Sequence, residues 1–226
     1  MYYSKEQLEL MADDINNKFF PNRLTNAIAL DPYDLLDNLG CLYDWKYISP
    51  DKSVLGMTVF ENSLWPIWEN GNFKSGDNCK LALFKKDTIV INQSVLDGQK
   101  NRGEENFVVA HEASHWIKDK EYFMGNPDNV FQVCSKNSFN QTNWTAEMKE
   151  LDIIECQTNY MAAAILMPRD ILKAEFFRLL RFKNIPQSPL QLQRFMFGTI
   201  QKLSKIFNVN FNPVKYRLMD IGVLER

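Results

Sequence analysis

The sequence has 226 residues, 45% of them hydrophobic and 24% charged, which is the composition of an ordinary globular protein and not of a disordered one. Its length suits one sizeable domain, or a domain with a small appendage. No stretch supplies the roughly 18 uninterrupted apolar residues of a membrane span. The N-terminus has no basic region followed by an apolar one, so it does not read as a signal peptide. We therefore expect a cytoplasmic protein with no membrane partner.

The net charge of −2 combines two regions of opposite sign. Residues 1–167 contain 15 lysines and arginines against 24 acidic residues, a net charge of −9. Residues 168–226 contain 11 against 4, a net charge of +7. This asymmetry predicts a boundary near Pro168. The four cysteines form no CxxC pair, so we expect reduced, mostly buried thiols and no disulfide framework.

Two helices are predicted at the N-terminus. Residues 4–20 begin with a capping box, Ser4 and Gln7, and carry apolar residues at helical spacing. A shorter helix follows, with Asp31 as its N-cap and Gly40 just past its end.

From residue 41 the pattern changes to short apolar runs separated by polar and glycine-containing stretches. Three of these runs predict strands of a small, mostly antiparallel sheet, at residues 54–60, 81–84 and 89–91. The turn signals between them, which suggest hairpins, are Asn70-Gly71 and Gly76-Asp77.

Two longer helices are predicted next. Residues 104–118 have acids in the first turn and apolar residues on more than one side, which predicts a mostly buried helix. Thr145 is expected to cap a second helix, which stops at Pro168. The polar residues 119–143 between them are longer than an ordinary connection and are typical of a lid or binding loop.

The basic C-terminal segment is predicted to be helical, with helices at residues 190–197 and 200–207. Asn208 tolerates a left-handed conformation and can make the turn that follows. A last helix is expected from Asn212 onward, which completes the outline of a helix-turn-helix.

Residues 111–115, HEASH, match the HExxH pattern of zinc peptidases. Positions i and i+4 of a helix lie on one face, so His111 and His115 can bind one ion. Glu112 is rotated by about 100° and stands beside that ion, where a general base can take a proton from a zinc-activated water. The pattern also arises by chance, but two randomly placed histidines would fall four apart only about once in a hundred chains. We predict one Zn²⁺ per chain.

The third ligand must be a carboxylate, because the chain has only two histidines. Glu155 lies among apolar residues of the later helix, where an ionised carboxylate needs a strong partner. The alternative is that Glu155 is not a ligand and lies on the solvated side of a half-buried helix. Asn159, four residues on, falls on the same face and could hydrogen-bond a ligand, or could serve only packing. The oxyanion-stabilising residue is left open among Tyr122, Tyr160 and Arg169.

These motifs resemble the ImmA/IrrE family of metallopeptidases. The matching stretches are TIVIN at 88–92, NFVVAHEASH at 106–115 and ECQTNYMAAAILMP at 155–168. The flanks are similar as well: DPYDLLDNLG resembles the family's short N-terminal helix, and IQKLSKIFNVNFNPVKYRLMDIGVL its helix-turn-helix-like segment. The resemblance implies an α+β, zincin-like peptidase domain over residues 1–167. A basic helix-turn-helix-like segment over residues 168–226 would pack on it.

By this resemblance His111, His115 and Glu155 correspond to the zinc ligands and Glu112 to the catalytic acid/base. Four positions depart from the family pattern, and altered packing is expected there without lost chemistry. These positions are Ala113, Ser114, Thr158 and Met161, where leucine, glycine, alanine and phenylalanine are usual.

The resemblance also implies the substrate. A zinc endopeptidase of this family would cleave a helix-turn-helix (XRE-type) transcriptional repressor and so relieve repression of mobile-element or stress genes. The alternative is a regulator with a structural zinc site, which binds an acidic partner or nucleic acid through its basic segment. The basic side chains that could do so, or could form a solvated face, are Lys202, Lys205, Lys215 and Arg217.

Overall fold

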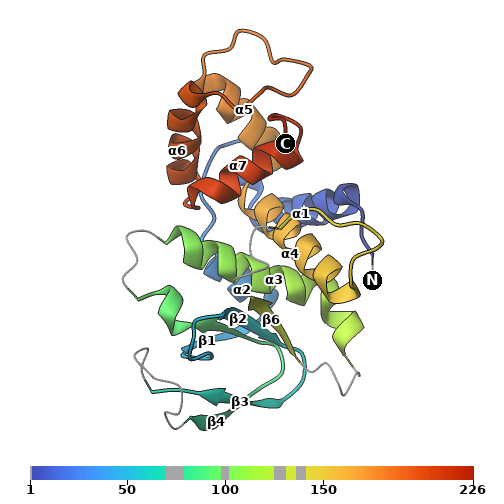
Figure 1. Cartoon of the computed structure of the whole chain (residues 1–226), viewed down its shortest axis with the longest axis vertical. Helices are drawn as coiled ribbons and strands as arrows, with labels where there is room; N and C mark the ends of the chain where they lie inside the picture. Colours follow the sequence, from blue (N-terminus) through green and yellow to red (C-terminus); the bar gives the residue numbers. More distant parts are fainter. Residues whose placement is uncertain (1, 70–78, 98–101, 125–130, 136–140) are drawn as a thin grey trace.

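A computed structural model describes residues 2–69, 79–97, 102–124, 131–135 and 141–226. In this part of the chain, seven α-helices combine with a four-stranded and a two-stranded sheet, which confirms the α+β class. The elements are layered, with the sheets at one end and the last three helices at the other (Figure 1). None of the described helices combines the length and the apolar character of a membrane span.

The two N-terminal helices form as their end signals predict. In α1 (Lys5–Phe19) the Ser4 hydroxyl accepts from the backbone N–H of Gln7, and the Gln7 side chain accepts from that of Ser4. Helix α2 (Pro32–Leu39) ends at Gly40, whose φ of 71° is the left-handed conformation that glycine adopts without strain. The capping box and the glycine stop are therefore confirmed.

The main sheet has the strand order β1-β5-β2-β6. Its strands are β1 (Leu42–Lys46), β2 (Val54–Val59), β5 (Thr88–Asn92) and β6 (Phe131–Ser135). Strand β2 pairs antiparallel with both β5 and β6, whereas β1 runs parallel to β5. The sheet is thus mixed. The parallel edge was not predicted, because charged residues interrupt the apolar ones in the sequence of β1, LYDWK, which therefore gives no apolar run.

A two-stranded sheet of β3 (Ser63–Ile67) and β4 (Lys80–Phe84) covers one face of the main sheet. Met57 of β2 and Val90 of β5 pack there with Phe84. Strand β3 was missed because it contains a proline, which is tolerated only at sheet edges. The predicted hairpin turns at Asn70-Gly71 and Gly76-Asp77 lie outside the described residues.

The two central helices are α3 (Gly103–Phe123) and α4 (Glu150–Leu166), which pack on each other. Helix α3 lies between the main sheet and α4, so it is buried on two sides, as its all-round apolar pattern predicts. The predicted cap at Thr145 is wrong, because this residue belongs to a separate turn and α4 begins after Lys149.

The segment 119–143 was expected to be a loop, but two described parts of it are regular. Helix α3 continues to Phe123, and Phe131–Ser135 form the edge strand β6. Five residues are too few to show a strand period among polar neighbours, and their strand conformation depends on pairing with β2.

The C-terminal segment contains α5 (Arg169–Leu179), α6 (Phe197–Ile206) and α7 (Phe211–Asp220). Asn208 makes the turn before α7 with a φ of 51°, as predicted. The helix expected at residues 190–197 is wrong for residues 190–193, whereas Arg194–Met196 form a 3-10 helix that leads into α6. Leu190 is held in an extended bridge to Leu224, with backbone hydrogen bonds to residues on either side of it.

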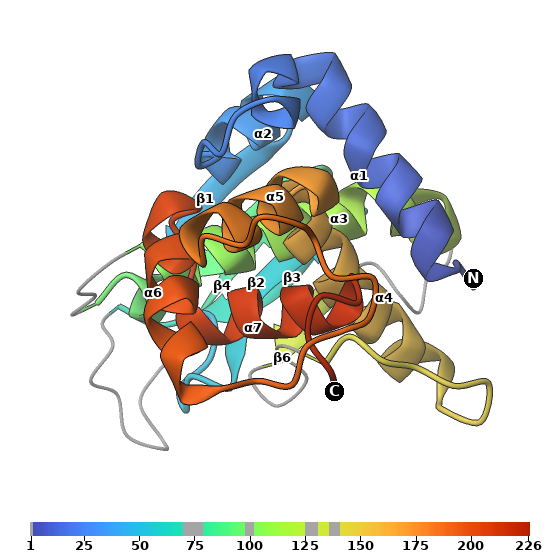
Figure 2. The same ribbon diagram turned by 90° about the horizontal axis from the view of Figure 1, so that it is seen from above.

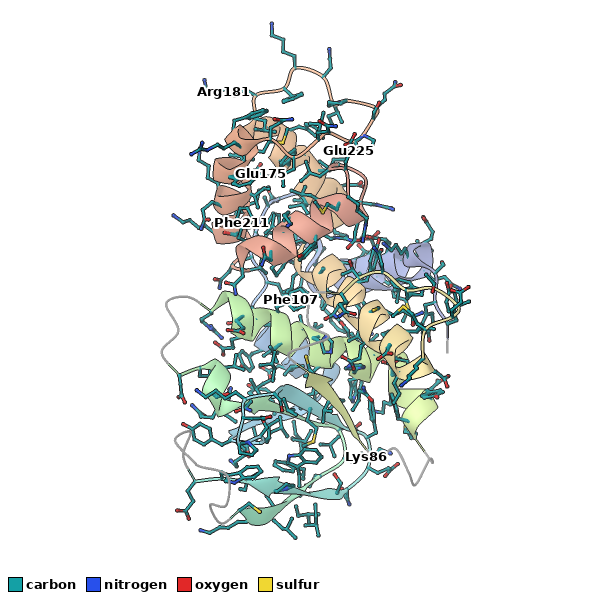
Figure 3. The ribbon with its side chains drawn as sticks, viewed as in Figure 1. Lys86, Phe107, Glu175, Arg181, Phe211 and Glu225 are labelled. Atoms are coloured by element: carbon teal, nitrogen blue, oxygen red, sulfur yellow. The ribbon has the colours of Figure 1, made fainter. Side chains whose placement is uncertain are left out.

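One apolar core runs from α1 through α3 and α4 to the C-terminal helices. Phe107 of α3 lies where that helix faces α7, and Phe211 opens α7 (Figure 3). Seen from above, α5, α6 and α7 cover α3 and α4 (Figure 2). Residues 168–226 are thus packed on the rest of the chain.

A buried ion pair fastens the C-terminal helices to α1. Arg217 of α7 donates to Glu9 of α1 through both terminal nitrogens, with an Nη2–Oε2 distance of 2.8 Å, and Tyr160 donates to the same carboxylate at 2.6 Å. Burial opposes ionisation of Glu9, but Arg217 outweighs it and holds the pKa of Glu9 below its usual value. Arg217 was predicted to be a possible surface contact for an acidic partner. Its guanidinium is instead buried inside the protein, where it forms the ion pair with Glu9.

We expect Arg217→Ala to lower the free energy of unfolding by about 3–5 kcal/mol, because it leaves the Glu9 carboxylate buried without its charge partner. Urea unfolding followed by circular dichroism measures this. Arg178→Ala is the control, since its pair with Glu175 involves an exposed guanidinium and is worth under about 1 kcal/mol. Equal losses in the two variants would contradict a special role for the buried pair.

Candidate metal site

Helix α3 presents His111 and His115 to α4, where they meet Glu155. The Nε2 atoms of the two histidines are 3.1 Å apart. The carboxylate of Glu155 lies 3.4 Å from Nε2 of His111 and 3.1 Å from Nε2 of His115. The structure therefore brings together the three residues that the sequence predicted as ligands, and all three are buried.

These distances fit a metal ion. Nitrogen and oxygen ligands lie about 2.0–2.2 Å from zinc, so neighbouring ligand atoms of a tetrahedral site are roughly 3.3–3.6 Å apart. Two imidazole nitrogens and a carboxylate are also ligands that zinc accepts. The group can hold a metal ion with little movement, although its geometry does not identify which metal.

Hydrogen bonds on the far ring nitrogens orient both imidazoles. Nδ1 of His111 lies 2.9 Å from Oδ1 of Asn159, and Nδ1 of His115 lies 2.7 Å from Oδ2 of Asp119. Partners of this kind fix the tautomer that leaves Nε2 directed at the metal. Asn159 has the contact proposed for it. Asp119 was missed, although its i+4 spacing from His115 repeats the spacing that linked the two histidines.

Asp119 is itself paired inside the protein. The ammonium of Lys118 is buried and donates to both oxygens of Asp119, at 2.7 and 2.6 Å. Burial opposes the ionisation of Asp119, but Lys118 and His115 outweigh it and hold the pKa of Asp119 below its usual value. A buried lysine was not expected here, because lysines are almost never fully buried unless they are paired.

The charges of the site are balanced between the two helices. Burial by itself would lower the pKa of His115, but Glu155 and Asp119 outweigh it and raise that pKa to about 9. Burial dominates at His111 and lowers its pKa. The two histidines hold the pKa of Glu155 well below its usual range despite its burial. A ligating imidazole must be neutral, so a metal ion would take the place of the proton on His115.

Glu112 faces the sheet and not α4. Its Oε2 accepts a hydrogen bond of 2.6 Å from the hydroxyl of Thr58 on β2, and its carboxylate lies against Gly56 of the same strand. Its Oε1 is buried and has no hydrogen-bond partner among the described residues. Burial raises the pKa of Glu112 to about 8. This glutamate is therefore positioned beside the ligands with one oxygen left for a further group.

Strand β6 closes the site at the edge of the sheet. Gln132 donates from its side-chain amide to Oε1 of Glu155 at 2.7 Å. Two residues on and therefore on the same face, the thiol of Cys134 lies within 4.8 Å of a ring nitrogen of His111 and a carboxylate oxygen of Glu112. Neither residue was predicted at the site, because β6 itself was read as part of a loop.

The three open candidates for oxyanion stabilisation have their contacts elsewhere. Tyr160 donates to Glu9, and Arg169 lines a separate cavity of about 320 Å³ between α1 and α5. Tyr122 packs against Phe123, near the end of α3. No contact of these side chains with the three ligands is seen in the described part of the chain, so the oxyanion group stays unidentified.

Comparison of the chain with models of known protein families gives no match, and neither does comparison with curated protein sequences. The resemblance to the ImmA/IrrE family therefore stays a prediction, which rests on the sequence motifs quoted for it. The roles of the site residues rest on those motifs and on the geometry.

We expect Gly56→Ala to lower the free energy of unfolding by about 1–3 kcal/mol, because the added methyl carbon would lie 2.6 Å from Oε1 of Glu112. In a Glu112→Ala background the same substitution should cost little, since the clashing carboxylate is gone. Urea unfolding of the four proteins of this double-mutant cycle measures the coupling. Gly198→Ala, where a methyl would meet nothing within 4 Å, is the control.

We expect Asp119→Asn to weaken zinc affinity by about 10–100-fold, because the amide cannot supply the charge that strengthens His115 as a ligand. Competition with a chromophoric chelator measures the affinity. Glu121→Gln makes the same chemical change at an exposed position of α3 and should leave the affinity unchanged. A folded Asp119→Asn protein with native affinity would show that Asp119 does not support the ligand.

Proposed function

We propose that this chain is a zinc-dependent endopeptidase with His111, His115 and Glu155 as ligands and Glu112 as the catalytic acid/base. One observation carries the proposal. The carboxylate of Glu112 is buried within 4.8 Å of a ring nitrogen of His111, one of the three convergent ligands, and its Oε1 is unpartnered among the described residues. A site that only held a metal for stability would gain nothing from this carboxylate and would lose the free energy of burying it.

The surroundings of Glu112 suit proton transfer. Thr58 fixes Oε2 by its hydrogen bond, so Oε1 is the atom that takes up a proton and later delivers it to the leaving amine nitrogen. A bound zinc ion supplies the rest of the chemistry, since it lowers the pKa of water to about 7 and polarises a carbonyl. A base must be ionised. The raised pKa of Glu112 falls when positive charge is held beside it.

Support for a zincin-like fold comes from the order of elements. A short strand precedes the HExxH helix, that helix lies along the sheet, and the third ligand comes from the next long helix. The substrate is proposed from the family resemblance, as a helix-turn-helix repressor of the XRE type. An extended segment of it would add to the sheet near α3 by main-chain hydrogen bonds. The C-terminal helices would help to hold this substrate.

The alternative, a regulator that binds DNA or a protein partner, has weaker support. Arg217 is buried in its pair with Glu9 and cannot reach a phosphate. Lys202 and Lys205 of α6 are exposed, which suits a solvated face as well as a binding surface. The peptidase hypothesis accounts for Glu112, and the regulator hypothesis does not.

We expect Glu112→Gln to keep the fold and the zinc and to lose at least about a hundredfold in cleavage rate, because an amide cannot act as the base. Purified repressors encoded near this gene are the substrates to test, with cleavage followed by electrophoresis and zinc by metal analysis. His111→Ala should instead lose the metal. Normal cleavage by Glu112→Gln would refute the mechanism, and unchanged zinc in His111→Ala would refute the ligand assignment.

A further inference from the structure

Cys134 belongs to a second group of potential ligand atoms that shares His111 with the first. Its thiol, a ring nitrogen of His111 and a carboxylate oxygen of Glu112 all lie within 4.8 Å of one another. All three residues are fully buried. Ligands of a tetrahedral site are roughly 3.3–3.7 Å apart, so the sulfur would have to move toward His111 to enter the coordination sphere of a metal held there.

The strand geometry explains why the thiol lies there. Cys134 is the cross-strand partner of Gly56, and Glu112 occupies the space that a side chain at Gly56 would fill. Cys134 therefore approaches the site over a position with no side chain. Gln132, on the same face of β6, is already bonded to the ligand Glu155. The inner face of β6 thus lies on the metal group at two points.

Oε1 of Glu112, for which the described part of the chain offers no hydrogen-bond partner, is an independent observation. A fully buried carboxylate oxygen without a partner implies that a further group or proton normally accompanies it. A thiol must lose its proton before it can bind a metal. Glu112 is a base close to Cys134, because its carboxylate oxygen and the thiol lie within 4.8 Å of each other.

We infer that Cys134 is a fourth protein ligand, which closes the metal site in a resting state of the protein. The S–H bond breaks, the sulfur binds the metal, and the proton goes to Oε1 of Glu112. This step needs no oxidant or other reactant. It removes the open coordination position and the free base together, so the closed state is inactive. The inference rests on the proposed function, because it assumes a metal on His111, His115 and Glu155.

The closed state differs from a structural zinc site in one respect. A structural site needs its fourth ligand for folding, whereas Cys134 sits on a strand that, among the residues the structure describes, pairs only with β2 and forms the edge of the sheet. Withdrawal of β6 would open the position for water and substrate and would leave three ligands on α3 and α4. Removing the thiol should therefore open the site without losing the metal.

The test uses the full chain loaded with Co²⁺ in place of zinc. A cobalt–thiolate bond gives a charge-transfer band in the near ultraviolet, which nitrogen and oxygen ligands do not give. We expect this band in the wild type and its absence in Cys134→Ser, with cobalt still bound. Cys156→Ser is the matched control, because Cys156 is buried next to Glu155 but belongs to neither ligand group. It should keep the band.

Access to the open position is measured with acetohydroxamate, which binds through a free coordination position. We expect acetohydroxamate to bind cobalt-loaded Cys134→Ser about tenfold more tightly than the wild type. This ratio corresponds to a wild-type closed state that is about ten times as populated as the open state. Cys134→Ala should behave in the same way, which excludes an effect of the serine hydroxyl. Circular dichroism checks that each variant is folded.

Each of the other outcomes would overturn a specific part of the inference or of the proposed function. Wild type that binds cobalt without a thiolate band overturns the role of Cys134 and leaves the proposed function standing. Wild type that binds no cobalt overturns both. A folded Cys134→Ser protein that loses the metal overturns the resting-state closure and favours a structural site. A band that survives in His115→Ala would put the metal on His111, Glu112 and Cys134, which also overturns closure of the proposed site.

Discussion

The structure depends on the burial of charged side chains between α3, α4 and the main sheet. Five ionisable side chains are shielded from solvent there, although water would hydrate the charged form of each one favourably. They are Glu112, His115, Lys118, Asp119 and Glu155. Groups of this kind are tolerated only where opposite charges and hydrogen bonds compensate the lost hydration. Asp119 is compensated by Lys118 and His115, and Glu155 by both histidines. In the described part of the chain, the Glu112 carboxylate accepts a hydrogen bond from Thr58 on one oxygen, and its other oxygen has no hydrogen-bond partner. The incomplete compensation lies where a metal and a reacting group would complete it.

The rest of the fold serves to hold α3 and α4 in this relation. The apolar residues around α3 let it pack on the sheet with one side and on α4 with another, so its histidines and Glu112 point to different neighbours. Strand β2 provides a glycine and a threonine at the two positions below Glu112. Helix α1 covers α4 from outside, and the pair of Glu9 with Arg217 ties α7 to the same layer. The basic C-terminal segment is in this way part of the scaffold of the site, whatever else it binds.

Strand β6 contributes two further side chains to the surroundings of the site. It adds an edge to the sheet beside the ligands and brings an amide and a thiol onto them. A sheet edge beside a metal is suited to pairing with an extended peptide, and it is also suited to a segment of the same chain that competes with that peptide. In the proposed peptidase, the same element would serve both substrate binding and its restraint, depending on whether Cys134 is bound to the metal.

The sequence by itself determined the helices with clear end signals and the α+β class, and it predicted that His111, His115 and Glu155 come together. These follow from local spacing within helices, from the count of histidines and from the apolar surroundings of Glu155. The catalytic role of Glu112 stays a prediction. Asn159 was within reach of the same reasoning, and so was Asp119. The tertiary structure alone decided the contacts made by Gly56, Thr58, Gln132 and Cys134, since strand pairing joins residues whose separation in sequence carries no period. It also decided that Arg217 is internal, because a surface and a buried arginine look alike until the partner Glu9, more than 200 residues away, is placed beside it. Local order is fixed by neighbours along the chain, but the burial of charge is fixed by packing between distant segments.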